Sequence, residues 1–115
     1  MSWLKESYKR SKRLQDSYSL NGIQIYIKDP LSGKIDMNFV TRYITSRIPH
    51  ILMKGVDVIY VGQFEDLIKR DVNAIYEDGA IYLTNTQENE MDVIDDIIHE
   101  IAHAAEKEYA AMIYS

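Results

Sequence analysis

The feature that most constrains the fold is the run DVIDDIIHEIAHAAEKEYAAM, residues 92 to 112. At about 100° per residue, its main apolar positions share one side of a helix. They are Ile94, Ile97, Ile98, Ile101, Ala105 and Met112. Asn89 is a suitable N-cap, and Glu90 and Asp92 suit the first turn. The sequence therefore predicts a long C-terminal amphipathic helix whose apolar side packs on another layer.

Three upstream segments have the patterns of β-strands. GIQIYIKD, residues 22 to 29, alternates apolar and polar residues, as a half-buried strand does. VDVIYVG, residues 56 to 62, is nearly continuous and β-branched, which indicates a buried central strand. NAIYED and AIYLTN flank Asp78-Gly79, a dipeptide that strongly favours a tight hairpin.

Further helices are expected between and before these strands. Residues 2 to about 17 form an amphipathic pattern that continues to Tyr18 and ends at Asn21-Gly22. FVTRYITSRI, residues 39 to 48, reads as a helix capped by Asp36, and FEDLIKRD adds a short one. The order of elements predicts an α+β fold: one domain over residues 1–115, with a small mixed sheet and helices packed on one face.

Composition limits which side chains could bind a metal and which cellular compartment is expected. The chain has no Cys, so a metal would be bound by His and carboxylates, and a cytoplasmic protein is favoured. No stretch approaches the roughly 18 apolar residues of a spanning helix, so no membrane partner is expected.

Charge is unevenly distributed along the chain, whose net charge is −5. Five cations crowd the N-terminal segment: Lys5, Lys9, Arg10, Lys12 and Arg13. Such a segment can contact nucleic acid, anionic lipid or an acidic partner, or it can be a solvated helix face. No nucleic-acid motif accompanies it and the remainder is acidic, so nucleic acid is not an expected partner.

The run HEIAH, His99 to His103, carries the candidate chemistry. Three His and eight Glu in 115 positions produce H-E-x-x-H in roughly one shuffled chain in 300. Two His four residues apart on a helix can both reach one ion at about 2.0 to 2.1 Å. Glu100 is rotated off their line and is suited to hydrogen-bond a water and act as general base.

A structural explanation of the same residues stays open. The polar side of an amphipathic helix is expected to carry polar residues, and His99 and His103 can be solvated there. Asp92, Asp95 and Asp96 can orient the imidazoles as hydrogen-bond acceptors, or can stabilise the helix through its dipole.

The run IDDIIHEIAHAAE resembles the active-site helix of the HExxH zinc metallopeptidases, the zincins. The stretch from about Ile48 to Glu106 resembles small single-domain zincin-like proteins of phages and bacteria. The resemblance implies Zn²⁺ bound by His99 and His103, Glu100 as general base, a peptide or protein substrate, and the host cytoplasm if a phage encodes the protein. It also implies that a strand, here residues 80 to 84, forms the cleft edge on which a peptide pairs.

The sequence departs from the zincin pattern at the third zinc ligand. In the metzincin extension of the motif, the Gly and third His fall where this chain has Glu106 and Tyr109. Glu106 lies one turn beyond the pair, Glu108 points toward the apolar side, and His50 is a candidate from elsewhere. One explanation is a truncated chain whose continuation carries the missing acid.

The alternative function is a non-catalytic one. A zincin-like module without its third ligand would bind but not cleave, and a phage accessory protein would act through the basic N-terminal helix. Metal content together with peptidase activity distinguishes these from the enzyme.

Overall fold

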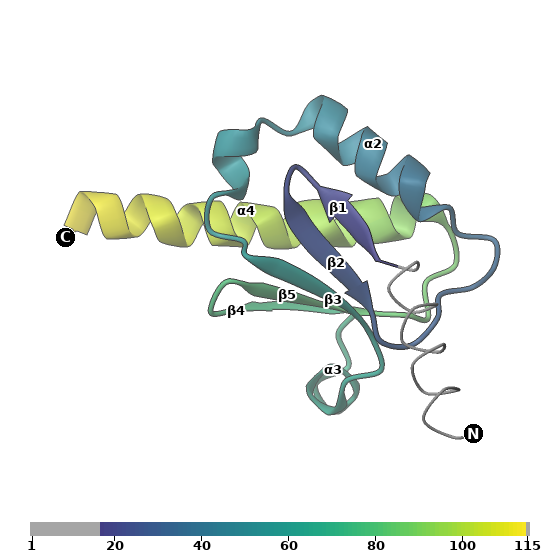
Figure 1. Ribbon diagram of the computed structural model, residues 1–115. Coiled ribbons are helices and arrows are strands. Elements are labelled where there is room, and N and C mark those ends of the chain that lie inside the picture. Colours follow the sequence, from purple (N-terminus) through teal and green to yellow (C-terminus); the bar gives the residue numbers. More distant parts are fainter. Residues whose placement is uncertain (1–16, 115) are drawn as a thin grey trace, which may run out of the picture.

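The computed structural model describes residues 17–114 and places them in a five-stranded mixed sheet with helices packed against it (Figure 1). In chain order the elements are β1 (Tyr18–Leu20), β2 (Ile23–Ile27), α2 (Met37–Arg47), the 3-10 helix η1 (His50–Met53), β3 (Val58–Gly62), α3 (Glu65–Arg70), β4 (Ala74–Glu77), β5 (Ala80–Thr84) and α4 (Glu90–Tyr114). The predicted α+β class and mixed sheet are confirmed, with HEIAH on the long C-terminal helix.

The strands lie in the order β1-β2-β3-β5-β4. Central β3 pairs in parallel with both β2 and β5, and the edge strands β1 and β4 are antiparallel to their neighbours. Ile59 and Val61 of β3 are fully buried. The β-branched run at residues 56 to 62 therefore forms the buried central strand that its composition predicted.

The hydrophobic core lies between one face of the sheet and the helices α2 and α4. Ile25, Ile59 and Ile81 occupy neighbouring positions on that face, and all three are fully buried. α2 and α4 cover them with residues that are also fully buried: Val40, Ile44, Val93, Ile94 and Ile97. The short helix α3 lies on the other side of the sheet from α2 (Figure 1). The two long helices thus share one face of the sheet.

Two caps predicted from the sequence fix where these helices begin. Asp36 Oδ1 accepts hydrogen bonds from the backbone N–H of Asn38 at 2.9 Å and of Phe39 at 3.3 Å. Asn89 accepts from the N–H of Asp92 at 2.9 Å. The N–H of Asp36 also donates to Glu90 at 2.9 Å, which ties the start of α2 to the start of α4.

Both Asx-Gly dipeptides form hairpin turns with positive φ at each residue. Asp78-Gly79 joins β4 to β5, as predicted, with φ of 50° and 85°. Asn21-Gly22 joins β1 to β2 with nearly the same angles, 51° and 87°. The expectation that this dipeptide ends a helix reaching Tyr18 is wrong, because Tyr18 pairs with β2 as part of β1. The rest of that predicted helix, residues 2–16, lies outside the described residues.

α4 is longer than the sheet that it covers. Ile94, Ile97 and Ile101 are buried as predicted, whereas Met112 is 75% exposed. The C-terminal turns of α4 extend beyond the sheet (Figure 1), so the prediction that Met112 faces the core is wrong. The side of the helix was predicted correctly, but the sheet ends before the helix does.

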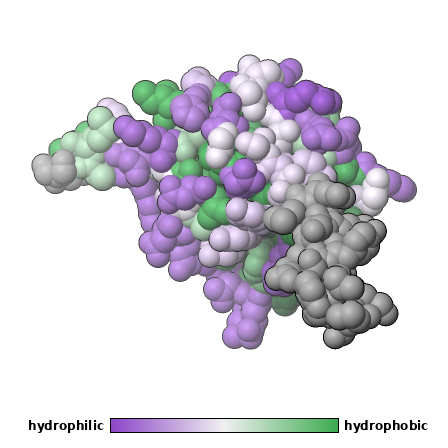
Figure 2. All heavy atoms as spheres, viewed as in Figure 1, coloured by the Kyte–Doolittle hydropathy of each residue, from purple (hydrophilic) through white to green (hydrophobic). Residues whose placement is uncertain are grey.

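Figure 2 shows hydrophilic side chains over most of this side of the molecule, with smaller hydrophobic patches between them. Within residues 17–114, no helix combines the length and the apolar character that crossing a membrane requires.

Candidate metal centre

The two histidines of HEIAH meet on the exposed side of α4. The Nε2 atoms of His99 and His103 are 3.1 Å apart, and the rings stand edge to face at an interplanar angle of 89°. Two nitrogens bound to one tetrahedral zinc at about 2.0 to 2.1 Å would lie about 3.3 Å apart. The separation of the two nitrogens is therefore close to that of two zinc ligands. Without an ion, one imidazole can donate a hydrogen bond to the other.

Glu100 lies on a different side of α4 from His99, toward β4. Its side chain is buried, with 7% exposure, and it lines a cleft together with His103. No hydrogen bond or ion pair joins its carboxylate to another residue of 17–114. The carboxylate is therefore free to accept a proton or a hydrogen bond from a molecule in the cleft.

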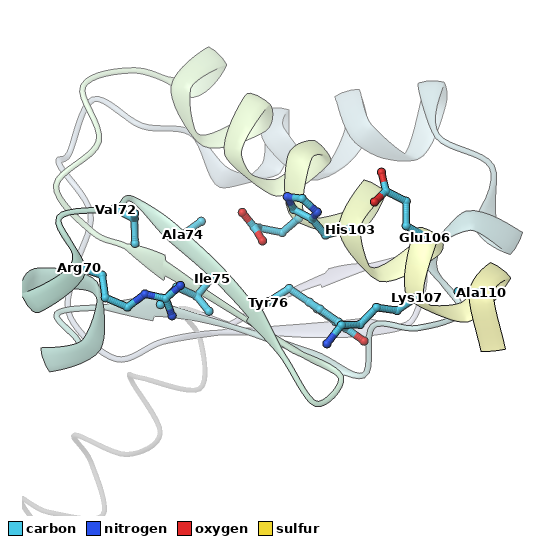
Figure 3. A pocket seen from close by; sticks show the side chains of 10 residues that line it. Arg70, Val72, Ala74, Ile75, Tyr76, His103, Glu106, Lys107 and Ala110 are labelled. Atoms are coloured by element: carbon cyan, nitrogen blue, oxygen red, sulfur yellow. The ribbon is translucent and has the colours of Figure 1, made fainter. Parts of the chain in front are cut away.

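This cleft is open, has a volume of about 600 Å³ and lies between α4 and β4. In Figure 3, His103 and Glu106 of α4 lie across it from Ala74, Ile75 and Tyr76 of β4. The remaining lining residues are Arg70, Val72, Glu100, Lys107 and Ala110. The hydroxyl of Tyr76 donates to the backbone carbonyl of Gly55 at 2.7 Å, which anchors the β4 wall of the cleft.

No protein-family model, curated protein or solved structure matches this chain.

The strand that borders the cleft is β4, not the predicted strand at residues 80 to 84. That segment is β5, which lies inside the sheet, parallel to β3 on one side and antiparallel to β4 on the other. Both of its edges are occupied, so it cannot pair with a peptide. The outer edge of β4 has no partner strand among residues 17–114. The sequence showed a hairpin but not which of its arms would pair with β3.

The candidates for a third ligand do not join the histidine pair. Glu106 lines the cleft one turn beyond His103. The side chain of Glu108 packs against Gly55, so closely that a Cβ added to this glycine would lie 3.0 Å from the Cγ of Glu108. His50 is exposed at the start of η1. Within the described part of the chain, no three His, Asp or Glu side chains are grouped so as to hold one metal ion.

The acidic residues that precede the motif do not orient the imidazoles. Asp96 accepts a hydrogen bond from the side chain of Gln87 at 2.9 Å, and no hydrogen bond joins it to His99. Burial raises the pKa of Asp96 above its ordinary value of 3.8, against the opposing effect of the Gln87 hydrogen bond. Asp92 lies in the first turn of α4, where a negative charge stabilises the helix dipole.

Proposed function

We propose that this protein is a zinc-dependent metallopeptidase in which His99 and His103 hold the metal and Glu100 is the general base. One observation carries the proposal: the Nε2 atoms of His99 and His103 meet at 3.1 Å. The burial of Glu100 in the cleft that His103 also lines supports its role as the base. The resemblance of IDDIIHEIAHAAE to the zincin helix supports the same roles. The absence of Cys also makes the cytoplasm, of the host cell for a phage protein, the proposed compartment.

Zinc in such a site would supply a Lewis acid that polarises a substrate carbonyl and brings the pKa of a water to about 7. Glu100 would take a proton from the attacking water and pass it to the leaving amine. Burial between α4 and β4 restricts where its carboxylate can move, and its lack of a protein partner leaves it available for this transfer.

The unpaired edge of β4 supports a peptide as the substrate. The backbone carbonyl of Asn73 accepts a hydrogen bond from the N–H of Thr84 in β5. Along an antiparallel strand, the backbone N–H and C=O groups of successive residues point alternately toward the paired strand and away from it. The backbone N–H and C=O groups of Ala74 and Tyr76 therefore point away from β5, toward the open edge. An extended peptide can pair with these groups by β-addition. Both residues line the cleft, so the peptide would lie beside Glu100 and His103.

Replacing the proposed base tests this function. In Glu100→Gln, hydrolysis of a quenched fluorescent peptide library should fall at least about 100-fold, because general-base catalysis contributes about 10²- to 10⁴-fold. Zinc content should be unchanged, since the amide replaces no ligand. Glu108→Gln is the matched control and should retain activity, because Glu108 does not line this cleft.

Undiminished hydrolysis by Glu100→Gln would refute the assigned role of Glu100. Zinc binding by the wild-type protein without cleavage of any peptide would instead favour the alternative, a zincin-like module that binds but does not cleave.

A further inference from the structure

We propose that Arg70 makes the cleft selective for peptides with an acidic side chain, an inference that rests on the proposed binding of a peptide there. Arg70 is the last residue of α3 and lines the cleft with Glu100 and His103. Figure 3 shows its side chain entering at one end of the cleft and extending along β4 toward Ile75. Its guanidinium therefore lies beside the strand edge on which a peptide would pair.

Arg70 has no ion-pair partner within residues 17–114, unlike two other cations of the chain. The adjacent Lys69 pairs with Glu65 at 3.1 Å, and Lys28 pairs with Asp29 at 2.9 Å. A guanidinium carries five N–H donors in a planar fork that matches a carboxylate. The fork of Arg70 is therefore available to the carboxylate of a bound peptide.

The two ends of the cleft differ in charge. Val72, Ala74 and Ile75 are the uncharged lining residues near Arg70, and no ion pair joins Arg70 to an acidic residue of 17–114. At the other end, Glu106 and Lys107 have opposite charges and their side chains extend to opposite sides (Figure 3), and the ammonium of Lys107 is 5.7 Å from the centroid of the Tyr76 ring. Selection for an acidic side chain is therefore expected at the Arg70 end, where no acidic residue of the lining follows or precedes the cation in the chain.

The geometry of a paired strand brings a peptide side chain to this position. Residues of an extended peptide advance about 3.3 to 3.4 Å each, and alternate side chains point to the same side. A peptide paired with Ala74 and Tyr76 would thus place one side chain beside Arg70. Because a charge-assisted hydrogen bond is about twice as strong as a neutral one, a carboxylate there should gain about five- to tenfold in affinity over an amide.

A peptide-binding experiment tests the inference without relying on cleavage. The probes are fluorescent peptides of one length that carry Glu or Gln at each position in turn, and affinity is read from anisotropy with Glu100→Gln protein. At one position, the Glu peptide should bind about five- to tenfold more tightly than its Gln counterpart. Adding Arg70→Gln should make the two affinities equal. Adding Lys69→Gln removes the same charge one residue away and should leave the difference intact.

Three results would overturn the inference: no position at which Glu is preferred, a preference that survives Arg70→Gln, or no measurable binding of any peptide. A failure of the proposed enzymatic function gives a different result. Wild-type protein would then cleave none of these peptides, while the preference for Glu and its loss in Arg70→Gln would remain.

Discussion

Single residues whose roles depend on near neighbours could be predicted from the sequence. Asp36 and Asn89 cap the two long helices because a short polar side chain before a helix can accept the unpaired N–H groups of its first turn. The approach of His99 to His103 follows from their spacing of four. The burial of Glu100 could not be predicted in the same way, because it depends on where β4 lies.

The raised pKa of Asp96 leads to a prediction about stability. Burial is its largest cause, Asp92 and Asp95 raise it further, and the Gln87 hydrogen bond and His99 oppose the shift. Because the folded-state pKa exceeds the unfolded one, the folded protein binds more protons than the unfolded chain between the two pKa values. Stability therefore falls as pH rises through the raised pKa, and the loss is absent below about pH 3.8.

Asp96→Asn removes this ionisation and keeps an oxygen for Gln87. It should raise the free energy of unfolding by about 0.5 kcal/mol at pH 7, a small gain because the carboxylate is partly exposed and its charge is screened by solvent. Near pH 3.5 the substitution should have little effect on the free energy of unfolding. Urea unfolding at both pH values with a chelator present measures this. Asp57→Asn is the control, because Asp57 is exposed and is not among the groups that shift the pKa of Asp96. An equal gain at both pH values, or a loss at pH 7, would contradict the explanation.

At the scale of elements, the sequence indicated the main strands and helices from residue 22 onward, while tertiary context decided how they pair. The two dipeptides of the Asx-Gly type illustrate the difference. Asp78-Gly79 lies between two clear strand patterns and was read correctly as a hairpin. Asn21-Gly22 precedes one such pattern but follows a helical one, so the three-residue strand β1 was missed. Its pairing with β2 became clear only in the structure.

The cap of α2 provides a test at this scale. Asp36→Ala removes two hydrogen bonds to the first turn of α2, at 2.9 and 3.3 Å, and should lower the free energy of unfolding by about 1 kcal/mol. Asp36→Asn, which can still cap, should cost much less. Urea unfolding of both variants at neutral pH measures the difference. If the Ala and Asn variants are equally stable, the cap does not stabilise α2.

At the scale of the whole molecule, the α+β class followed from the order of patterns, but the position of the cleft did not. A hairpin can join a sheet through either of its two strands. Here β5 pairs with β3, which leaves β4 at the edge of the sheet, across the cleft from α4. That choice brings Ala74, Ile75 and Tyr76 next to Glu100 and creates the cleft. No pattern within either strand distinguishes the two arrangements, because contacts between different elements decide which strand pairs with β3.

The central claim is that His99 and His103 bind zinc, and zinc per chain is the most direct measurement of it. Protein purified without chelators and exchanged from excess zinc should contain about one zinc per chain by elemental analysis. His99→Ala and His103→Ala should each lose the metal. His50→Ala is the matched control and should keep it, because His50 lies apart on η1. A wild-type protein that binds no zinc even from excess, or variants that keep it, would contradict the claim.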